Sequence, residues 1–135
     1  MTVAYKILVV DDEAHILHVV SLKLCKAGLD VITAQDGEEG LETFLAEHPD
    51  LIITDFQMPR MTGVEFCKEV RRQEQAHHVP VILLTARGFD VDPSEIMAAD
   101  IAAVLEKPFS PQEVLTRVQQ LLPEKPTHVS AEVQP

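Results

Sequence analysis

The segment ILVVDD, residues 7–12, decides how the rest of this chain is interpreted. Residues 7–10 form a continuous run of branched aliphatic side chains, without the alternation of apolar and polar residues typical of a half-exposed strand. Such a run indicates a strand covered on both faces, as in a parallel sheet between helices. Two carboxylates, Asp11 and Asp12, follow directly at the expected carboxyl end of the strand.

Similar aliphatic runs recur along the chain, separated by segments with helical periodicity. The runs lie at residues 51–53, 81–84 and 102–105, and a further strand is expected at 30–34. Helices are expected at about 14–27, ended by a left-handed Gly28, at about 36–48, with Leu41, Phe44 and Leu45 facing inward, and from 62 or 63 into the polar run 71–78. A short fourth helix is expected to begin at 92–95, and a fifth is expected at about 110–122, from a capping box with proline in its first turn. This alternation predicts an α/β fold, a three-layer (βα)5 arrangement with a five-stranded parallel sheet between two layers of helices.

Polar residues follow four of these strands and should meet at one place. Asp55, Thr85 and Lys107 follow the third, fourth and fifth strands, as Asp11 and Asp12 follow the first. Because the carboxyl ends of parallel strands share one edge, these side chains should converge in the crevice where open α/β sheets bind ligands. Neighbouring carboxylates repel one another unless a cation lies between them, and a set of oxygen ligands suits Mg²⁺.

The same cluster suggests chemistry at phosphorus. A carboxylate at the position of Asp55 can act as a nucleophile and form an aspartyl phosphate. Lys107 supplies a positive charge for Asp55 and then for a phosphoryl oxygen, and Thr85 supplies a hydroxyl. Each residue also has an ordinary interpretation alone, as a helix cap, a turn aspartate, a strand-end hydroxyl or a surface lysine, and for all but Asp55 this ordinary interpretation is the commoner one. Only their joint placement favours a phosphoryl-transfer site.

Length and composition limit the other possibilities. A chain of 135 residues fits one domain, and a formal net charge of -11 argues against a nucleic-acid surface. No apolar run approaches the roughly 20 residues that span a bilayer. Cys25 and Cys67 are expected as small buried hydrophobic residues of helices, which suits a reducing, cytoplasmic location. Residues 123–135, with three prolines and no apolar periodicity, are expected to be a disordered tail or the stub of a linker.

Four motifs together resemble the receiver domain of two-component response regulators. They are the acidic DDE at 11–13, the segment DFQMPRMTG at 55–63, the Thr85-Ala86 pair, and the KPF segment at 107–109. The resemblance covers about residues 5–122 and implies the flavodoxin-like strand order 2-1-3-4-5, as in chemotaxis members of the family.

The resemblance implies roles for particular residues. Asp55 would be the phosphoacceptor, with Thr85 and Lys107 holding the phosphoryl oxygens beside backbone N–H groups at Gln57 and Ala86. Mg²⁺ would be bound by Asp12, by Asp55 and by the backbone carbonyl of Gln57, with Asp11 assisting through water. Lys107-Pro108 would be a cis peptide bond.

The resemblance also implies partners. The phosphoryl donor would be a histidine kinase or a histidine phosphotransfer protein, with no direct nucleic-acid or membrane contact by this domain. A downstream protein or output domain would then bind the surface formed by the fourth helix, the fifth strand and the fifth helix, which phosphorylation alters. Dimerisation that depends on phosphorylation is a further expectation.

One position departs from the family pattern. Three residues before the lysine, the family usually has Tyr or Phe, whose ring swings inward when the threonine moves, and here the residue is Val104. A β-branched aliphatic side chain cannot make such a movement, so the usual relay is in question.

Two other functions remain open. A Mg²⁺-dependent phosphatase resembling the dehalogenase superfamily would need a second Asp two residues after the nucleophile, where this chain has Gln57. A docking module that is never phosphorylated would be favoured by a degenerate site, and the four motifs here are intact.

Overall fold

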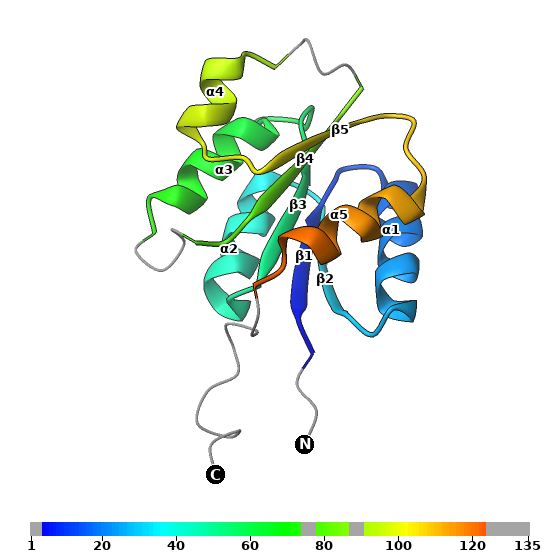
Figure 1. Cartoon of the computed structure of the whole chain (residues 1–135). Coiled ribbons are helices and arrows are strands. Elements are labelled where there is room, and N and C mark those ends of the chain that lie inside the picture. The colour runs from blue at the N-terminus through cyan, green and yellow to red at the C-terminus, as the bar shows by residue number, and fades with distance from the viewer. Residues whose placement is uncertain (1–3, 74–77, 87–90, 124–135) are drawn as a thin grey trace.

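The structure is a computed structural model that describes residues 4–73, 78–86 and 91–123. Strands and helices alternate along these residues (Figure 1). In chain order they are β1 (Lys6–Val10), α1 (Ala14–Lys26), β2 (Asp30–Ala34), α2 (Gly37–Glu47), β3 (Leu51–Asp55), α3 (Gly63–Arg71), β4 (Val81–Thr85), α4 (Pro93–Ala98), β5 (Ala103–Glu106) and α5 (Pro111–Leu121). The strands form one parallel sheet in the order β2-β1-β3-β4-β5, which confirms the predicted fold and strand order.

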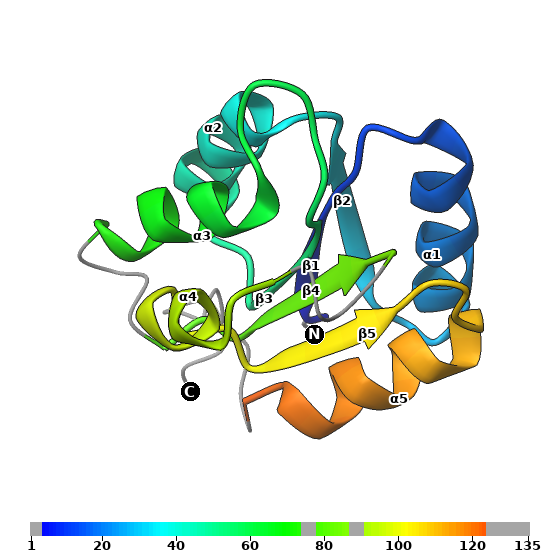
Figure 2. The same cartoon turned by 90° about the horizontal axis from the view of Figure 1, so that it is seen from above.

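Helices cover both faces of this sheet, as the continuous aliphatic runs predict. Figure 2 shows α1 and α5 on one face and α2 and α3, with α4 beside them, on the other. Successive residues of a strand point to opposite faces, so Ile7 and Ile53 pack with the α1 and α5 side chains, whereas Leu8 and Ile52 pack with those of α2 and α3. No helix in the described part of the chain is long and apolar enough to cross a membrane.

Side chains of the expected types begin and end the helices. Thr62 and Glu65 form a capping box at the start of α3, and Ser110 and Glu113 form another at α5, so free backbone N–H groups of each first turn are satisfied. Gly28 follows α1 with φ 90, as predicted for a left-handed helix end. These caps set the residue at which α3 and α5 begin after the strands that precede them.

Two predictions about buried side chains are wrong. Leu45, expected to face inward with Leu41 and Phe44, is 41% exposed, whereas Phe44 is buried. The inward stripe of α2 is therefore narrower than the apolar pattern suggests. Cys67 is buried as expected, but Cys25 is exposed, because it lies next to the buried Leu24 on the helix and so points about 100° away from it.

The sheet brings the predicted site residues to one edge. Val10, Asp55 and Thr85 are the last residues of β1, β3 and β4, and these strands lie side by side in parallel. In β3, Asp55 is paired in register with Leu84 of β4, and the next residue of β4 is Thr85. The carboxyl-terminal edge of the central strands therefore carries the polar cluster.

Candidate functional site

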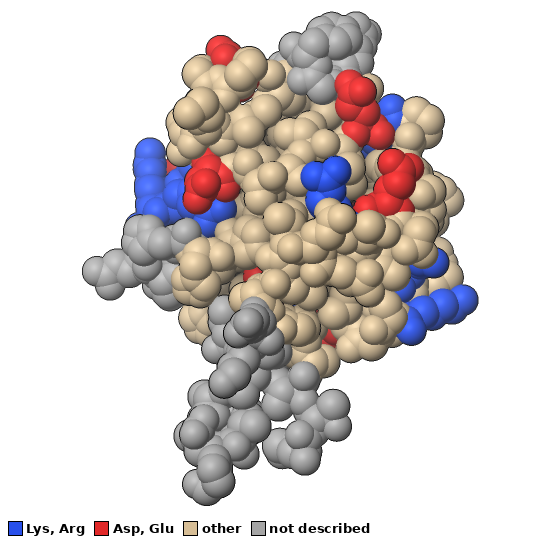
Figure 3. Space-filling model, viewed as in Figure 1, with Lys and Arg blue, Asp and Glu red and all other residues tan. Residues whose placement is uncertain are grey.

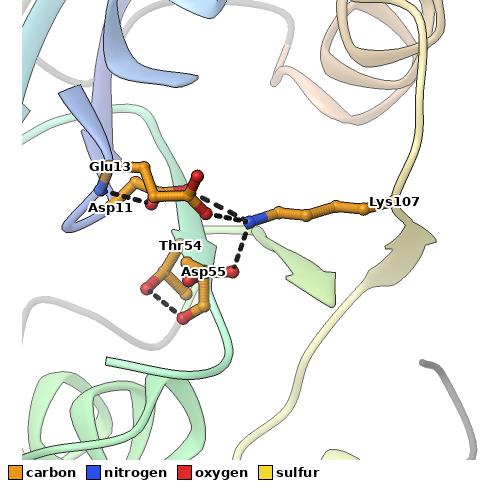
Figure 4. A network of polar contacts seen from close by, with 5 residues as sticks. All are labelled: Asp11, Glu13, Thr54, Asp55 and Lys107. Atoms are coloured by element: carbon orange, nitrogen blue, oxygen red, sulfur yellow. Dashed lines mark hydrogen bonds and ion pairs between the residues drawn. The ribbon is translucent and has the colours of Figure 1, made fainter. Parts of the chain in front are cut away.

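Asp55 lies at the centre of the cluster, at the end of β3. It is 4% exposed, and its Oδ1 lies 3.0 Å from Nζ of Lys107 (Figure 4). The chain turns sharply after it, because the N–H of Gly63 donates to the carbonyl oxygen of Phe56 at 2.8 Å. A Cβ at Gly63 would come within 2.2 Å of the Asp55 carbonyl oxygen, so this approach of α3 to the strand end requires glycine.

Asp11 is the most deeply buried carboxylate of the site. Asp11 as a whole residue is 0% exposed, and its Oδ1 accepts a hydrogen bond from the backbone N–H of Glu13 at 2.9 Å. Its Oδ2 has no hydrogen-bond partner among the described residues and lies 3.7 Å from Nζ of Lys107. A buried carboxylate oxygen without a hydrogen bond is costly, so this atom fits a site that a cation or a bound water completes.

Three carboxylates converge closely enough to hold one cation. Oxygen atoms of Asp11, Asp12 and Asp55 all lie within 4.8 Å of one another, with Asp12 exposed and the other two buried. An oxygen-only set with one exposed member matches the preference of Mg²⁺ for a few carboxylates and several waters. Bound Mg²⁺ would supply positive charge that offsets the mutual repulsion of these groups.

Burial and crowding shift the pKa values at this edge. Burial, with a contribution from the charge of Asp55, raises the pKa of Asp11 to about 6, although the Glu13 N–H opposes the shift. Burial also raises the pKa of Asp55, with the Asp12 charge adding to it and Lys107 opposing it. For Lys107, burial alone would lower the pKa, but the hydrogen bond to Asp55 and the charges of the surrounding acids raise it above its usual value. Lys107 is thus held as a cation.

The remaining predicted residues lie at the same edge. Thr85 is 2% exposed, and its carbonyl oxygen accepts from the backbone N–H of Lys107 at 2.7 Å, which joins the ends of β4 and β5. Ala86 follows Thr85 and is exposed. Gln57, two residues after Asp55, is also exposed. The peptide bond Lys107-Pro108 is cis, as the resemblance implies.

Sequence reasoning missed one member of the cluster. Glu13 places its Oε1 3.4 Å from Nζ of Lys107, so this lysine faces three carboxylates, with Asp11 and Asp55 as the others. The available signal was the third acid of the DDE motif. Glu is not among the residues preferred at a helix N-cap, which is the position Glu13 occupies before α1.

A groove lies beside Lys107, between the start of α1 and the segment that leads into α5. It has a volume of about 400 Å³ and is mostly apolar. Its lining consists of His15, Ile16, Val19, Val20, Lys107, Pro108 and Phe109.

The family model described as "Response regulator receiver domain" matches residues 7–119. The chain belongs to this family. The alkaline phosphatase synthesis transcriptional regulatory protein PhoP of Bacillus subtilis is 42% identical to this receiver domain over 119 residues, which cover 87% of this chain and 48% of that protein. The probable transcriptional regulator ycf27 of Cyanophora paradoxa is 41% identical, with the same coverage. The chain spans about half the length of these curated relatives.

Solved structures of chemotaxis and response regulators share the fold of this receiver domain. The chemotaxis response regulator CheY4 of Vibrio cholerae superposes with a TM-score of 0.83 at 39% identity, covering 89% of this chain and all of that one (100%). The response regulator protein TrrA of Thermotoga maritima, in complex with Mg²⁺ and beryllofluoride, has a TM-score of 0.78 at 33% identity, covering 87% of this chain and 99% of that one. The chain is therefore a receiver domain of signalling regulators, and a two-component function follows from family membership.

Proposed function

We propose that Asp55 accepts a phosphoryl group from the phosphohistidine of a histidine kinase or a histidine phosphotransfer protein, in a reaction that the receiver domain itself assists. An oxygen of Asp55 attacks phosphorus and the bond from phosphorus to the imidazole nitrogen breaks. The electron pair of that bond stays on the nitrogen, and the donor ring, protonated on its other nitrogen, leaves as neutral imidazole. The observation that carries this proposal is the position of Asp55, buried at the strand end between a lysine ammonium and two further carboxylates.

The surrounding residues have defined parts in this proposal. Asp12, Asp55 and the backbone carbonyl of Gln57 would hold Mg²⁺ directly, with Asp11 acting through water, and Mg²⁺ would neutralise charge that develops on the phosphoryl oxygens. Lys107 would move from Asp55 to a phosphoryl oxygen, and the Thr85 hydroxyl and the backbone N–H groups at Gln57 and Ala86 would bind the others. The similar response regulator TrrA was solved in complex with Mg²⁺ and beryllofluoride, which supports the proposal of a Mg²⁺ site in this receiver domain.

The apolar groove beside Lys107 is the surface on which the phosphodonor would dock. It opens next to the phosphoacceptor and has enough apolar lining, from Ile16, Val19 and Phe109, to receive side chains of a donor helix. Output would then use the face of α4, β5 and α5, where Met97 is 82% exposed, through a downstream protein, an output domain or a second copy of the phosphorylated chain.

Further parts of the proposal concern the chain as a whole. Residues 5–122 would act as the receiver, and residues 123–135 as a tail or linker, of which 124–135 lie outside the described residues. The donor proteins named above imply a cytoplasmic location. A dedicated phosphatase is less well supported, because Gln57 stands where that class needs a second carboxylate.

Phosphoryl incorporation from acetyl phosphate tests the proposal directly. Intact-mass spectrometry should show one added phosphoryl group in the wild type and none in Asp55→Asn. Asp30→Asn, an exposed aspartate of β2, is the matched control and should be labelled like the wild type. Equal labelling of Asp55→Asn and the wild type would exclude Asp55 as the acceptor.

A further inference from the structure

Glu13 stands at a helix N-cap without capping the helix. It precedes α1, yet its side chain makes no capping hydrogen bond. N-cap residues are usually Ser, Thr, Asp or Asn, whose short side chains reach the N–H groups of the first turn. The Glu13 carboxylate instead reaches Lys107, 94 residues along the chain, with Oε1 3.4 Å from Nζ. The Glu13 side chain therefore interacts with Lys107 and does not cap α1.

Lys107 is shared between Glu13 and the phosphoacceptor. Nζ lies 3.0 Å from Asp55 Oδ1 and 3.4 Å from Glu13 Oε1. The Asp55 side chain is 6% exposed, whereas that of Glu13 is 60% exposed, so Glu13 is the acid on the solvent side of Lys107. A phosphoryl group on Asp55 would extend from the buried acid toward the ammonium that Glu13 also contacts.

Phosphorylation changes the charge that Glu13 faces. A carboxylate carries one negative charge, whereas the phosphoryl group of an acyl phosphate carries between about 1.5 and 2 at neutral pH. The phosphoryl oxygens need Lys107 and repel the Glu13 carboxylate, whereas the unphosphorylated Asp55 shares Lys107 with it. Both the contact of Glu13 with Lys107 and its repulsion of the phosphoryl oxygens therefore favour the unphosphorylated state.

We infer that Glu13 is a positioning residue that weakens binding of the phosphoryl group, by holding Lys107 before phosphorylation and by repelling the phosphoryl oxygens afterwards. This inference rests on the proposed role of Asp55. The effect acts through solvent-exposed charge, so salt screens it. The charge of the side chain matters here, and its volume does not.

Beryllofluoride, a mimic of the phosphoryl group, measures this effect without a kinase. Titrations followed by fluorine NMR at saturating Mg²⁺ give its dissociation constant for the wild type and for Glu13→Gln. The dissociation constant of Glu13→Gln should be about three- to tenfold lower at low ionic strength, and the ratio should fall toward one at about 1 M salt. Glu13→Asp keeps the charge but shortens the reach to Lys107, and its value should lie between the two.

A matched control comes from the opposite edge of the sheet. Glu47 Oε1 lies 3.0 Å from Nζ of Lys6, in an exposed ion pair of the same type, so Glu47→Gln removes the same charge and one lysine contact. Its dissociation constant should equal that of the wild type. A wild type that binds no beryllofluoride would overturn the proposed function, and this inference with it. If the wild type binds beryllofluoride but the dissociation constant of Glu13→Gln equals or exceeds that of Glu47→Gln, this inference alone is overturned.

Discussion

The guanidinium of Arg71, on α3, donates a hydrogen bond from Nε to the carbonyl oxygen of Ala99 at 3.1 Å, just beyond the end of α4. Its Nη2 donates to the carbonyl oxygen of Asp100 at 2.9 Å. A second cation of α3, Lys68, forms an ion pair with Glu95. Figure 3 shows the basic side chains gathered over α3. Because no side chain of the six-residue α4 is fully buried, these contacts are a main part of what holds it to α3.

Removing the Arg71 side chain should loosen α4. Arg71→Ala leaves two carbonyl oxygens without their charged donor, and we expect a loss of about 1–2 kcal/mol in the free energy of unfolding. Hydrogen exchange should show faster exchange of the backbone amides in α4. Arg72→Ala is the matched control, since the Arg72 side chain is 73% exposed and its one ion pair among the described residues is with Glu69. This change should cost less than about 0.5 kcal/mol in the free energy of unfolding. Unchanged α4 exchange in Arg71→Ala would disprove this role.

Mg²⁺ should stabilise the folded protein. The cation binds the cluster of Asp11, Asp12 and Asp55, which exists only in the folded state, so the melting temperature should rise with Mg²⁺ concentration. At 100 times the dissociation constant the gain is about 2.7 kcal/mol. Thermal denaturation with and without millimolar Mg²⁺ measures it, and Asp12→Ala and Asp55→Asn should reduce the shift. A shift of the same size in both variants and the wild type would place the cation elsewhere.

The buried Asp11 should give the metal-free protein a characteristic pH dependence. Folding raises the pKa of Asp11 from 3.8 to about 6, so the folded state binds more protons than the unfolded state between these values. The contribution of Asp11 to stability is therefore greatest below about pH 4 and is lost as the pH rises through about 6. Asp11→Asn, which keeps the oxygen that accepts from Glu13, should remove this contribution. Urea denaturation in EDTA between pH 4.5 and 7.5 measures the free energy of unfolding of both proteins. The free energy of unfolding of the variant, relative to that of the wild type, should increase as the pH rises. A difference that does not change with pH would contradict the assignment.

Much of this arrangement could be predicted from the sequence, for identifiable reasons. The continuous runs of branched aliphatics located β1, β3, β4 and β5 to within two residues at their ends, since only a doubly covered strand tolerates them. The strand order came from the family resemblance, because periodicity does not specify which strands are neighbours. Asp11, Asp55, Thr85 and Lys107 were predictable because each ends or directly follows a strand of a parallel sheet.

The contacts that were not predicted depend on the direction in which long side chains point and on which distant residues they meet. The contact of Glu13 with Lys107 joins residues that are distant in the chain, and no local pattern encodes the direction in which a long side chain points. The hydrogen bonds of Arg71 depend on the left-handed turn at Asp100, with φ 53, which aims two carbonyl oxygens at α3. Leu45 belongs to the apolar pattern of α2 but lies at the margin of its buried face.

Val104 should alter how phosphorylation is transmitted. Its side chain is partly buried and packs, with Ile96 of α4, against the hydrophobic cluster on the α2 and α3 face of the sheet. It has no ring that could swing inward, so we expect transmission through Thr85 and the backbone that follows it. NMR spectra recorded with and without Mg²⁺ and beryllofluoride should show large changes near Thr85 and small ones at the Val104 methyl groups.

Two variants separate this route from a relay through β5. A ligand shifts a two-state equilibrium only by its different affinity for the two states, and a ring that fills a pocket in one state adds to that difference. Val104→Tyr should therefore extend the beryllofluoride-induced shifts from β4 into α4, next to Ile96. Thr85→Ala should bind beryllofluoride but lose the shifts beyond the site, because the hydroxyl that follows the phosphoryl group is gone. Large shifts around Val104 in the wild type that survive Thr85→Ala would show that β5 carries the signal without the threonine.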